Sequence, residues 1–305
     1  MLRSKLIPAA LATAVAFAAG PAMAYPDKNV DYIIPFNPGG ESDIAARMQQ
    51  SLFNELTGQQ LIVKYQAGAG GAQAWSQLNR MEGDGHTIMG MNLPHIILQP
   101  MQQDVGYTTE ELTPVYWFHY TPDAVIVPAD SQFQTIQDLI DYAKENPGMV
   151  TFSGSGSNSA NHLAQQQFDE LAGIVTTYIP FGGTGPSVTA LLGNQVTASW
   201  GYSTVAANQG DQVRMLAVAT DERMSVFPDV PTFKEIGIDM AGGAYRGVGV
   251  PQSTPEEVRK QVSDTFRQLN NDPRMVEQME ENAFVVIDIP YEEVDAFMAE
   301  HTQEI

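Results

Sequence analysis

The sequence predicts an α/β fold of two lobes joined by two extended crossings, and three observations predict it. Short runs rich in β-branched and aromatic residues alternate with amphipathic helical stretches, which is typical of helices that cover a largely parallel sheet. Several strands end in a glycine-rich turn that opens the next helix. Extended segments near 119–127 and 240–248 interrupt this alternation. If the C-terminal helices return to the first lobe, these segments connect the lobes and a cleft lies between them.

The first lobe opens with a strand at 30–36, and a helix follows it. In that helix Ile44, Met48 and Leu52 recur at the i, i+4, i+8 spacing, which predicts an apolar stripe. Ala45 and Leu56 widen this stripe. A second strand (QLIVKY), a glycine turn with a second helix (AGAGGAQAWSQLN) and a third strand (HTIMGMN) follow. The segment 113–128 is expected to form two extended pieces with a kink at Thr121-Pro122.

Beyond Pro128 the alternation of helices and strands starts again, which predicts the second lobe. We assign residues 123–243 to the second lobe and residues 25–122 and 244–305 to the first. In the second lobe we expect three helices, at 136–148, 161–173 and 185–193, and strands in the segments 149–157, 174–181, 195–201 and 213–220. The chain then crosses back through AYRGVGVP, and a long amphipathic helix at 254–270 and a last helix from Tyr291 complete it.

The composition excludes two classes of partner. The 305 residues include 36 acidic but only 15 basic ones, and the formal net charge is −21. Nucleic acids and anionic membrane surfaces both require a basic binding face, so we expect neither as a partner. Adaptation to high salt and ordinary acidity of a secreted protein both explain the charge, and the sequence leaves the two open.

The first 24 residues predict export. Arg3 and Lys5 precede an apolar stretch that ends near Gly20, and PAMA supplies a cleavage site after Ala24. We therefore expect residues 1–24 to be a signal peptide and the mature protein to be periplasmic. The chain contains no cysteine, which excludes disulfides, thiol catalysis and the usual cysteine-based zinc sites.

Three glycine-rich turns carry the strongest functional signal. The first is Asn37–Gly40, where Ser42 or Asp43 is expected to cap the following helix and leave first-turn N–H groups free for a carboxylate. The second is Ser153–Asn158, and the third is Gly182–Gly185. The first turn lacks the spacing of a P-loop and that of a dinucleotide-binding loop. Because ligands of open α/β sheets bind beyond the carboxyl ends of the strands, we expect these turns to form one anion site.

Arg246 is the one cation that we place at the site. It lies in the second crossing among small residues, where its guanidinium can hold a carboxylate with two parallel hydrogen bonds. The alternative is a surface ion pair with one of the many acidic residues, and the sequence leaves both open.

The sequence offers no catalytic constellation. The histidines at 86, 95, 119, 162 and 301 show no metal-ligand spacing, and SGSGS is not a nucleophile elbow. We expect His162 to make a hydrogen bond on its helix face or between the lobes, and Trp75, Trp117 and Trp200 to be packing residues. We predict no enzyme activity, no metal and no cofactor.

An ordered series of motifs covers almost the whole mature chain. It begins with YPDKNVDYIIPFNPGGESDIAARMQQ and continues through GDGHTIMG, SGSGSNSANHLA, IPFGGTGPSVTALLGNQV, FPDVPTFKEIG and RGVGVPQSTP. The series resembles the tripartite tricarboxylate transporter receptors, the Bug family of periplasmic solute-binding proteins. The resemblance implies a two-lobed periplasmic binding protein of type II (a Venus flytrap) that delivers a carboxylated solute to a two-component permease.

Two positions depart from the family pattern. Glu41 stands where a small or hydroxyl-bearing residue is usual, and Asn158 stands where proline is frequent. Glu41 either points to solvent or places a carboxylate beside the anion site, where it would disfavour a highly charged ligand.

We therefore predict a monomeric extracytoplasmic receptor for a small organic carboxylate, a di- or tricarboxylate, that serves a two-component membrane permease. A receptor for an amino acid or an aromatic carboxylate is the alternative, and a periplasmic hydrolase is the competing class. The resemblance and the three turns together give the residues expected to bind the ligand: Phe36, Asn37, Gly39, Gly40, Ser42, Asp43, Asn92, Ser153, Ser155, Gly156, Ser157, Asn158, Gly183, Thr184, Gly185 and Arg246.

Overall fold

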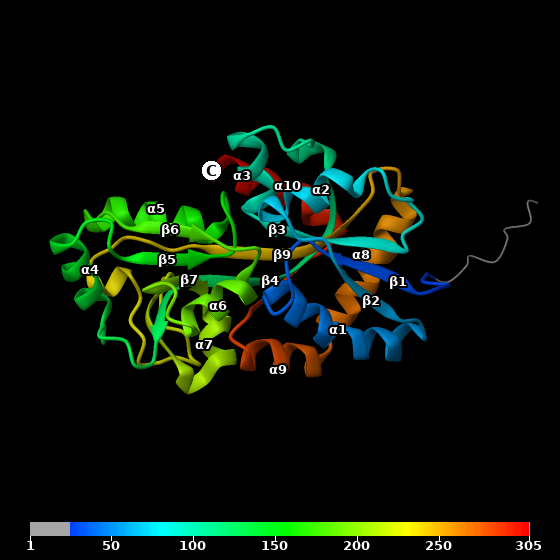
Figure 1. The fold of residues 1–305 in the computed structure, drawn as a ribbon. Coiled ribbons are helices and arrows are strands. Elements are labelled where there is room, and N and C mark those ends of the chain that lie inside the picture. Colours follow the sequence, from blue (N-terminus) through cyan, green and yellow to red (C-terminus); the bar gives the residue numbers. More distant parts are fainter. Residues whose placement is uncertain (1–24, 305) are drawn as a thin grey trace, which may run out of the picture.

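Two long strands, β4 (Thr113–Pro128) and β9 (Gly243–Val250), run antiparallel through the centre of a ten-stranded sheet. The computed structural model describes residues 25–304, so the predicted signal peptide lies outside the described residues. The strand order is β2-β1-β3-β9-β4-β7-β5-β6, and β8 and β10 both pair with β4 as well. Figure 1 shows one group of helices and strands on each side of this central pair. The two-lobed α/β fold predicted from the sequence is therefore present.

The first lobe contains a sheet of parallel strands with helices on both faces. Strands β1 and β2 and strands β1 and β3 pair in parallel, and β9 then joins β3 in antiparallel. The elements of this lobe are β1 (Val30–Ile34), α1 (Glu41–Thr57), β2 (Leu61–Tyr65), α2 (Ala72–Leu78), β3 (Thr87–Leu93), α3 (His95–Gln102), α8 (Glu256–Asn270), α9 (Pro273–Glu281), β10 (Val285–Ile289) and α10 (Tyr291–Glu304). The chain thus returns to the first lobe after the second crossing, as predicted (Figure 1).

The second lobe repeats this design on the other half of β4. Strands β5 and β6 and strands β5 and β7 pair in parallel, while β7 and β8 flank β4 in antiparallel. Its elements are α4 (Ile136–Glu145), β5 (Thr151–Gly154), α5 (Ala160–Ala172), β6 (Thr177–Pro180), α6 (Thr184–Leu192), β7 (Ala198–Tyr202), α7 (Ser203–Gln209) and β8 (Val213–Val218). We call residues 25–122 and 244–304 lobe 1 and residues 123–243 lobe 2, and these exact boundaries remain a prediction.

The kink predicted at Thr121-Pro122 is wrong, because β4 is one continuous strand. Residues 113–122 pair with β9, and Pro122 is the last of them, opposite Gly243. From Asp123 onward the strand pairs with β7 instead. Proline lacks the N–H that a ladder needs, and the position where one partner strand ends and another begins tolerates this loss.

The helix after the first strand buries a different stripe from the predicted one. Ala45, Gln49 and Phe53 are fully buried, while Leu56 is 37% exposed. The Gln49 Nε2 donates to Asn270 Oδ1 of α8 at 3.0 Å, while its Oε1 is buried without a partner among the described residues, so a polar residue bonded through its amide nitrogen lies in the middle of the apolar face. Ile44, Met48 and Leu52 pack at the edge of the core. A hydrophobicity pattern does not find a buried, hydrogen-bonded glutamine.

Each lobe has its own apolar core. The core of lobe 1 includes Trp75 and Trp117, and the core of lobe 2 includes Trp200, so all three tryptophans are packing residues as predicted. Among residues 25–304, no helix has the length and apolar character of a membrane span.

The aromatic core of lobe 2 gives a stability prediction. Phe168 is fully buried, and its ring centroid lies 5.5 Å from Trp200, 5.6 Å from Phe233 and 6.4 Å from Phe152. Phe168→Ala should lower the free energy of unfolding by roughly 3–5 kcal/mol, because it removes a buried ring and leaves a cavity. Urea denaturation followed by tryptophan fluorescence measures this. Phe168→Leu should lose clearly less, and equal losses would contradict the packing role.

Candidate functional site

The loop after β1 starts helix α1 without a side-chain cap. The N-cap residue is Gly40, in an extended conformation, so the prediction that Ser42 or Asp43 caps the helix is wrong. Both residues lie inside the first turn, where Asp43 Oδ2 reaches back and accepts a hydrogen bond of 2.8 Å from the N–H of Gly39. Asp43 Oδ1 accepts from Tyr65 Oη at 2.6 Å and pairs with Arg47 Nε at 2.9 Å. The first-turn N–H groups of Glu41 and Ser42 therefore donate to no N-cap side chain.

A small cavity lies between the lobes at the carboxyl ends of the strands. The space between its wall atoms is about 290 Å³, open solvent included, and with the lobes in contact it has room for about one water molecule. Lobe 1, lobe 2 and the second crossing all contribute to its wall, which is lined by Ile34, Phe36, Asn37, Gly40, Glu41, Ser42, Asp43, Asn92, His95, Ser155, Thr184, Tyr202 and Arg246. Such a position at the strand ends is where open α/β sheets bind ligands.

Arg246 is the cation of this cavity and is 4% exposed, which excludes the surface ion pair. It lies in the middle of β9, opposite Asn92 on β3 and His119 on β4. One guanidinium nitrogen, Nη1, donates to Thr121 Oγ1 and, at 2.8 Å, to the carbonyl oxygen of Ala244. The guanidinium carbon lies 4.6 Å from the centre of the Tyr202 ring, a cation–π contact.

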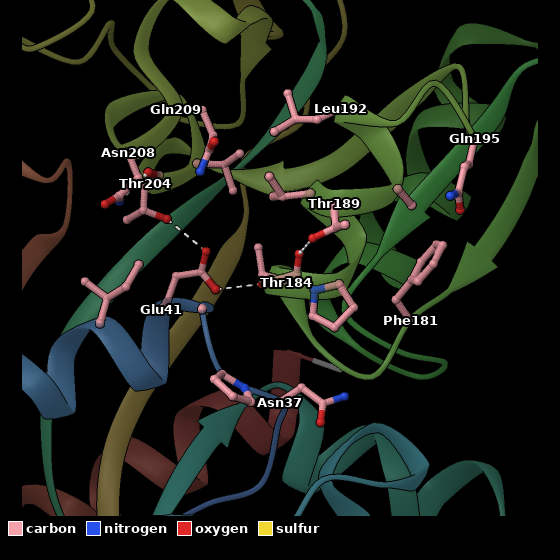
Figure 2. A pocket seen from close by; sticks show the side chains of 18 residues that line it. Asn37, Glu41, Phe181, Thr184, Thr189, Leu192, Gln195, Thr204, Asn208 and Gln209 are labelled. Carbon is pink, nitrogen blue, oxygen red and sulfur yellow. Dashed lines mark hydrogen bonds between the residues drawn. The ribbon is translucent and has the colours of Figure 1, made fainter.

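Glu41 faces the interior and not the solvent. It is 3% exposed, and its carboxylate accepts hydrogen bonds from Thr184 Oγ1 at 2.7 Å and from Thr204 Oγ1 at 2.9 Å. Its Oε2 lies 3.5 Å from Nη2 of Arg246. Figure 2 shows the carboxylate of Glu41, from the start of α1, between the two threonines of lobe 2. Glu41 thus connects lobe 1 to lobe 2.

Several polar atoms of the cavity wall lack a partner in the described part of the chain. Nε of Arg246 and Oδ1 of Asn92 are buried without any hydrogen bond. The hydroxyls of Ser155 and Tyr202 lie close to each other but form no hydrogen bond of good geometry. Since buried polar groups are nearly always paired, these atoms indicate a polar ligand or ordered water in the cavity.

Two titratable side chains of the cavity wall, His95 and Tyr202, are kept uncharged by burial. Desolvation, with a smaller contribution from the charge of Arg246, lowers the pKa of His95 to about 3. Desolvation also raises the pKa of Tyr202, although Arg246 opposes that shift. The His95 ring and the Tyr202 hydroxyl are therefore uncharged hydrogen-bonding groups at neutral pH.

Glycine allows the two lobes to touch on either side of the cavity. The N–H of Asn37 donates to the carbonyl oxygen of Gly182 at 3.0 Å, and a Cβ on Gly185 would overlap the carbonyl oxygen of Pro38. A second contact lies at Gln99, whose Nε2 donates to the carbonyl oxygen of Ser157 at 2.8 Å. The described arrangement is therefore one with the lobes in contact.

The predicted ligand residues separate into three groups. Those that line the cavity are Phe36, Asn37, Gly40, Ser42, Asp43, Asn92, Ser155, Thr184 and Arg246. Those at contacts between the lobes beside it are Gly39, Gly156, Ser157, Asn158, Gly183 and Gly185. Ser153 is fully buried under the loop, where its hydroxyl accepts a hydrogen bond from Ser187 Oγ at 2.8 Å. Strand β5 ends at Gly154, so Ser155 lies in the loop beyond it, where it lines the cavity.

Three polar wall residues were not among the predicted ligand residues. Glu41 was recognised as unusual, but the sequence left its direction open. Tyr202 is the last residue of β7, and His95 lies two residues beyond the end of β3. Their position at the carboxyl ends of these strands was the signal that could have found them. His162, by contrast, stacks on Tyr178 and accepts a hydrogen bond of 3.2 Å from the N–H of Asn158, within lobe 2.

A larger groove lies on the outer side of Glu41 (Figure 2). It holds about 1370 Å³, part of it open to solvent, and it shares Asn37, Glu41 and Thr184 with the inner cavity. The hydrogen bonds of Glu41 to Thr184 and Thr204 thus lie between the groove and the cavity. Among residues 25–304, no cluster of histidine and acidic residues could hold a metal ion.

The fold and the sequence both match known proteins. A family model described as "Tripartite tricarboxylate transporter family receptor" matches residues 44–304. A curated relative, the UPF0065 protein in the gbd 5′ region of Cupriavidus necator, is 30% identical over 89% of this chain and 84% of its own length. The structure of the periplasmic binding protein BugD is 26% identical with a TM-score of 0.86 over 92% of this chain and 96% of its own. MatC from Rhodopseudomonas palustris, solved with bound malate, is 23% identical with a TM-score of 0.82 over 92% of this chain and 97% of its own.

The contact at Gly185 predicts the effect of one added methyl group. Gly185→Ala should oppose closure of the lobes by roughly 1–3 kcal/mol, because the new Cβ overlaps Pro38 of the other lobe. Small-angle X-ray scattering should report a larger radius of gyration than for the wild type. Gly193→Ala, which meets only residues of lobe 2, is the matched control and should leave the radius unchanged.

Asp123 predicts how stability depends on pH. It is buried in β4 and accepts a hydrogen bond of 2.9 Å from Asn161 Nδ2. Burial raises the pKa of Asp123 to about 7, with opposing contributions from Asn161 and Arg246 and a further rise from the charge of Glu41. Between about pH 4 and pH 7 the unfolded chain gives up a proton that the folded protein keeps, so this residue lowers stability as the pH rises.

Asp123→Asn removes that titration. The melting temperature of the variant relative to the wild type should therefore rise on the order of 5 °C between pH 5 and pH 8. Thermal melts in a buffer series of constant ionic strength measure this difference. Asp141→Asn, at an exposed position of α4, serves as the control. A constant difference across the pH range would contradict the proton on Asp123.

Proposed function

The chain belongs to the tripartite tricarboxylate transporter receptor family, and we propose that it binds one small organic carboxylate in the cavity between its lobes. Members of this family are receptors and not enzymes. The observation that carries the proposal is the buried Arg246, a residue of the cavity wall whose Nε has no partner in the described chain. An N–H of a buried guanidinium requires an acceptor, and an ionised carboxylate is the acceptor that it binds most strongly.

Neutral groups complete the carboxylate site. The hydroxyls of Ser155 and Tyr202 from lobe 2 lie on the same wall as Arg246, and the start of α1 from lobe 1 adds backbone N–H groups. Each direct hydrogen bond to an ionised acceptor contributes about 1.5–3 kcal/mol. Because the donors come from both lobes, the ligand favours the arrangement in which the lobes are closed.

We base the proposed ligand class on the residues of the cavity and not on the relatives. MatC binds malate and has the same fold, but at 23% identity the likeness concerns the fold alone. The di- or tricarboxylate predicted from the sequence and the alternative amino-acid or aromatic carboxylate all offer a carboxylate to Arg246. The unpaired polar atoms of the cavity wall support a ligand with a carboxylate. How many carboxylates that ligand can carry depends on Glu41.

The wider role follows the family. We propose that the chain is exported, that it is cleaved after Ala24, and that the mature receptor acts as a monomer in the periplasm, where it delivers its ligand to a two-component membrane permease. The hydroxyl of Tyr25, the first residue after the proposed cleavage site, donates to the carbonyl oxygen of Gly85 at 2.8 Å. A chain that starts at Tyr25 therefore keeps its first residue attached to lobe 1.

A thermal-shift screen tests the proposal. Purified mature protein is heated with aliphatic mono- and dicarboxylates, aromatic carboxylates and amino acids, in low and high salt. A ligand that binds the folded state raises the melting temperature with its concentration by mass action, by about 2.7 kcal/mol of stabilisation at a hundred times Kd. NMR of the recovered ligand should show it unchanged, which separates a receptor from a hydrolase. No shift with any carboxylate would refute the proposed ligand class.

Arg246→Lys sharpens the assignment of the site. Lysine keeps a positive charge beside Glu41 but lacks the Nε donor and the planar fork, so carboxylate affinity should fall by about tenfold or more. Titration calorimetry with the best ligand of the screen measures the loss. Arg274→Lys, an exposed arginine of α9, is the matched control and should bind as the wild type does.

A further inference from the structure

The carboxylate of Glu41 occupies a site made by groups from outside its own helix. Its two threonine donors, Thr184 in α6 and Thr204 in α7, belong to lobe 2, and Arg246 lies on the second crossing. Thr184 is 6% exposed, Thr204 1% and Arg246 4%. A cation and two hydroxyls that converge in a buried place form a complete site for one carboxylate.

We propose that Glu41 fills this anion site permanently and thereby restricts the receptor to ligands with a single carboxylate beside Arg246. The inference rests on the proposed function and specifies its ligand class. Glu41 lies beside Nη2 of Arg246, and Nε of the same guanidinium has no partner among the described residues. A ligand carboxylate on Nε and the Glu41 carboxylate near Nη2 would together use the positive charge of Arg246.

The restriction to one ligand carboxylate follows from the charges of the cavity wall. Of the residues that line the cavity, Arg246 is the only lysine or arginine, while Glu41 and Asp43 bring carboxylates. Asp43 is already bonded to Gly39, Tyr65 and Arg47. A second ligand carboxylate would enter a buried space that offers no further cation, next to the charge of Glu41. Like charges at short range in a poorly solvated site repel strongly, which selects against dicarboxylates.

A ligand with one carboxylate avoids this repulsion. Its carboxylate meets Nε of Arg246 and the hydroxyls of Ser155 and Tyr202, and its other end lies near Asn92, His95 and the apolar ring of Phe36. A monocarboxylate with an uncharged hydroxyl or apolar tail matches that wall. The chemical class is therefore a small monocarboxylate or hydroxymonocarboxylate.

The first experiment tests the anion site without any physiological ligand. Glu41→Ala removes Cγ and the carboxylate, whose two carbons and two oxygens correspond to acetate, and leaves Thr184, Thr204 and Arg246 in place. Sodium acetate should raise the melting temperature of Glu41→Ala by several degrees more than sodium chloride of equal ionic strength. The wild type and Glu55→Ala, from an exposed position of the same helix, should show a clearly smaller acetate-specific rise, because Glu41 already fills the anion site in both proteins. An equal response of Glu41→Ala to both salts overturns the inference.

The second experiment compares ligands that differ in one carboxylate. Hexanoate and adipate form one pair, and 3-hydroxybutyrate and malate form the other. By calorimetry the wild type should bind each monocarboxylate at least tenfold more tightly than its dicarboxylate partner. Glu41→Gln, which keeps the shape and removes the charge, should reduce this ratio at least fivefold. A wild type that prefers the dicarboxylates, or a ratio that Glu41→Gln does not change, overturns the inference.

The two experiments distinguish the inference from the proposed function. If acetate stabilises Glu41→Ala but no carboxylate binds the wild type, the proposed receptor function fails and the occupied anion site stands. If carboxylates bind the wild type but the ratio in each pair is independent of Glu41, the receptor function stands and the restriction by Glu41 fails.

Discussion

A positive charge buried where the two lobes meet is the constraint on which the rest of the site depends. Arg246 is held in the middle of β9, almost without access to solvent, and a buried guanidinium must be neutralised and hydrogen-bonded. Thr121 and Ala244 satisfy one nitrogen within the central strands, and Glu41 supplies the opposite charge from the start of α1. Through Glu41, the start of α1 is joined both to this charge and to Thr184 and Thr204 of lobe 2.

The backbone around the cavity provides the close contact that such neutralisation requires. Carboxylate and hydroxyl groups of opposite lobes meet within 3 Å only if the loops beside them also touch, and Gly185 against Pro38 makes this possible. Strand β4 changes its partner from β9 to β7 between Pro122 and Asp123. One continuous strand therefore holds both lobes in register while their loops approach each other.

The acidity of the chain does not conflict with an anion site. The formal net charge of −21 belongs mainly to exposed residues, and solvent and salt screen charges separated by more than about 8–10 Å. Inside the cavity a single arginine, two hydroxyls and helix N–H groups act at contact distance in a poorly solvated space. The local arrangement is thus what an anion in the cavity meets. Of the acidic residues, Glu41 and Asp43 are the two that line the cavity.

The sequence by itself determined most of the helices and strands in their order, the two crossings, the family and the three glycine turns, because each of these depends on local periodicity and on residues close together in the chain; it missed the elements α3, α7, α9 and β10. It also identified Arg246 and the wall residues Asn92, Ser155 and Thr184. Only the tertiary structure decided that Glu41 points inward, that Thr204 and Tyr202 face it from lobe 2, and that Ser153 is buried instead in the core. The physical reason is that these side chains are placed by contacts between residues far apart in the chain, 34 positions for Ser153 and Ser187 and 163 for Glu41 and Thr204, and no local pattern records such contacts.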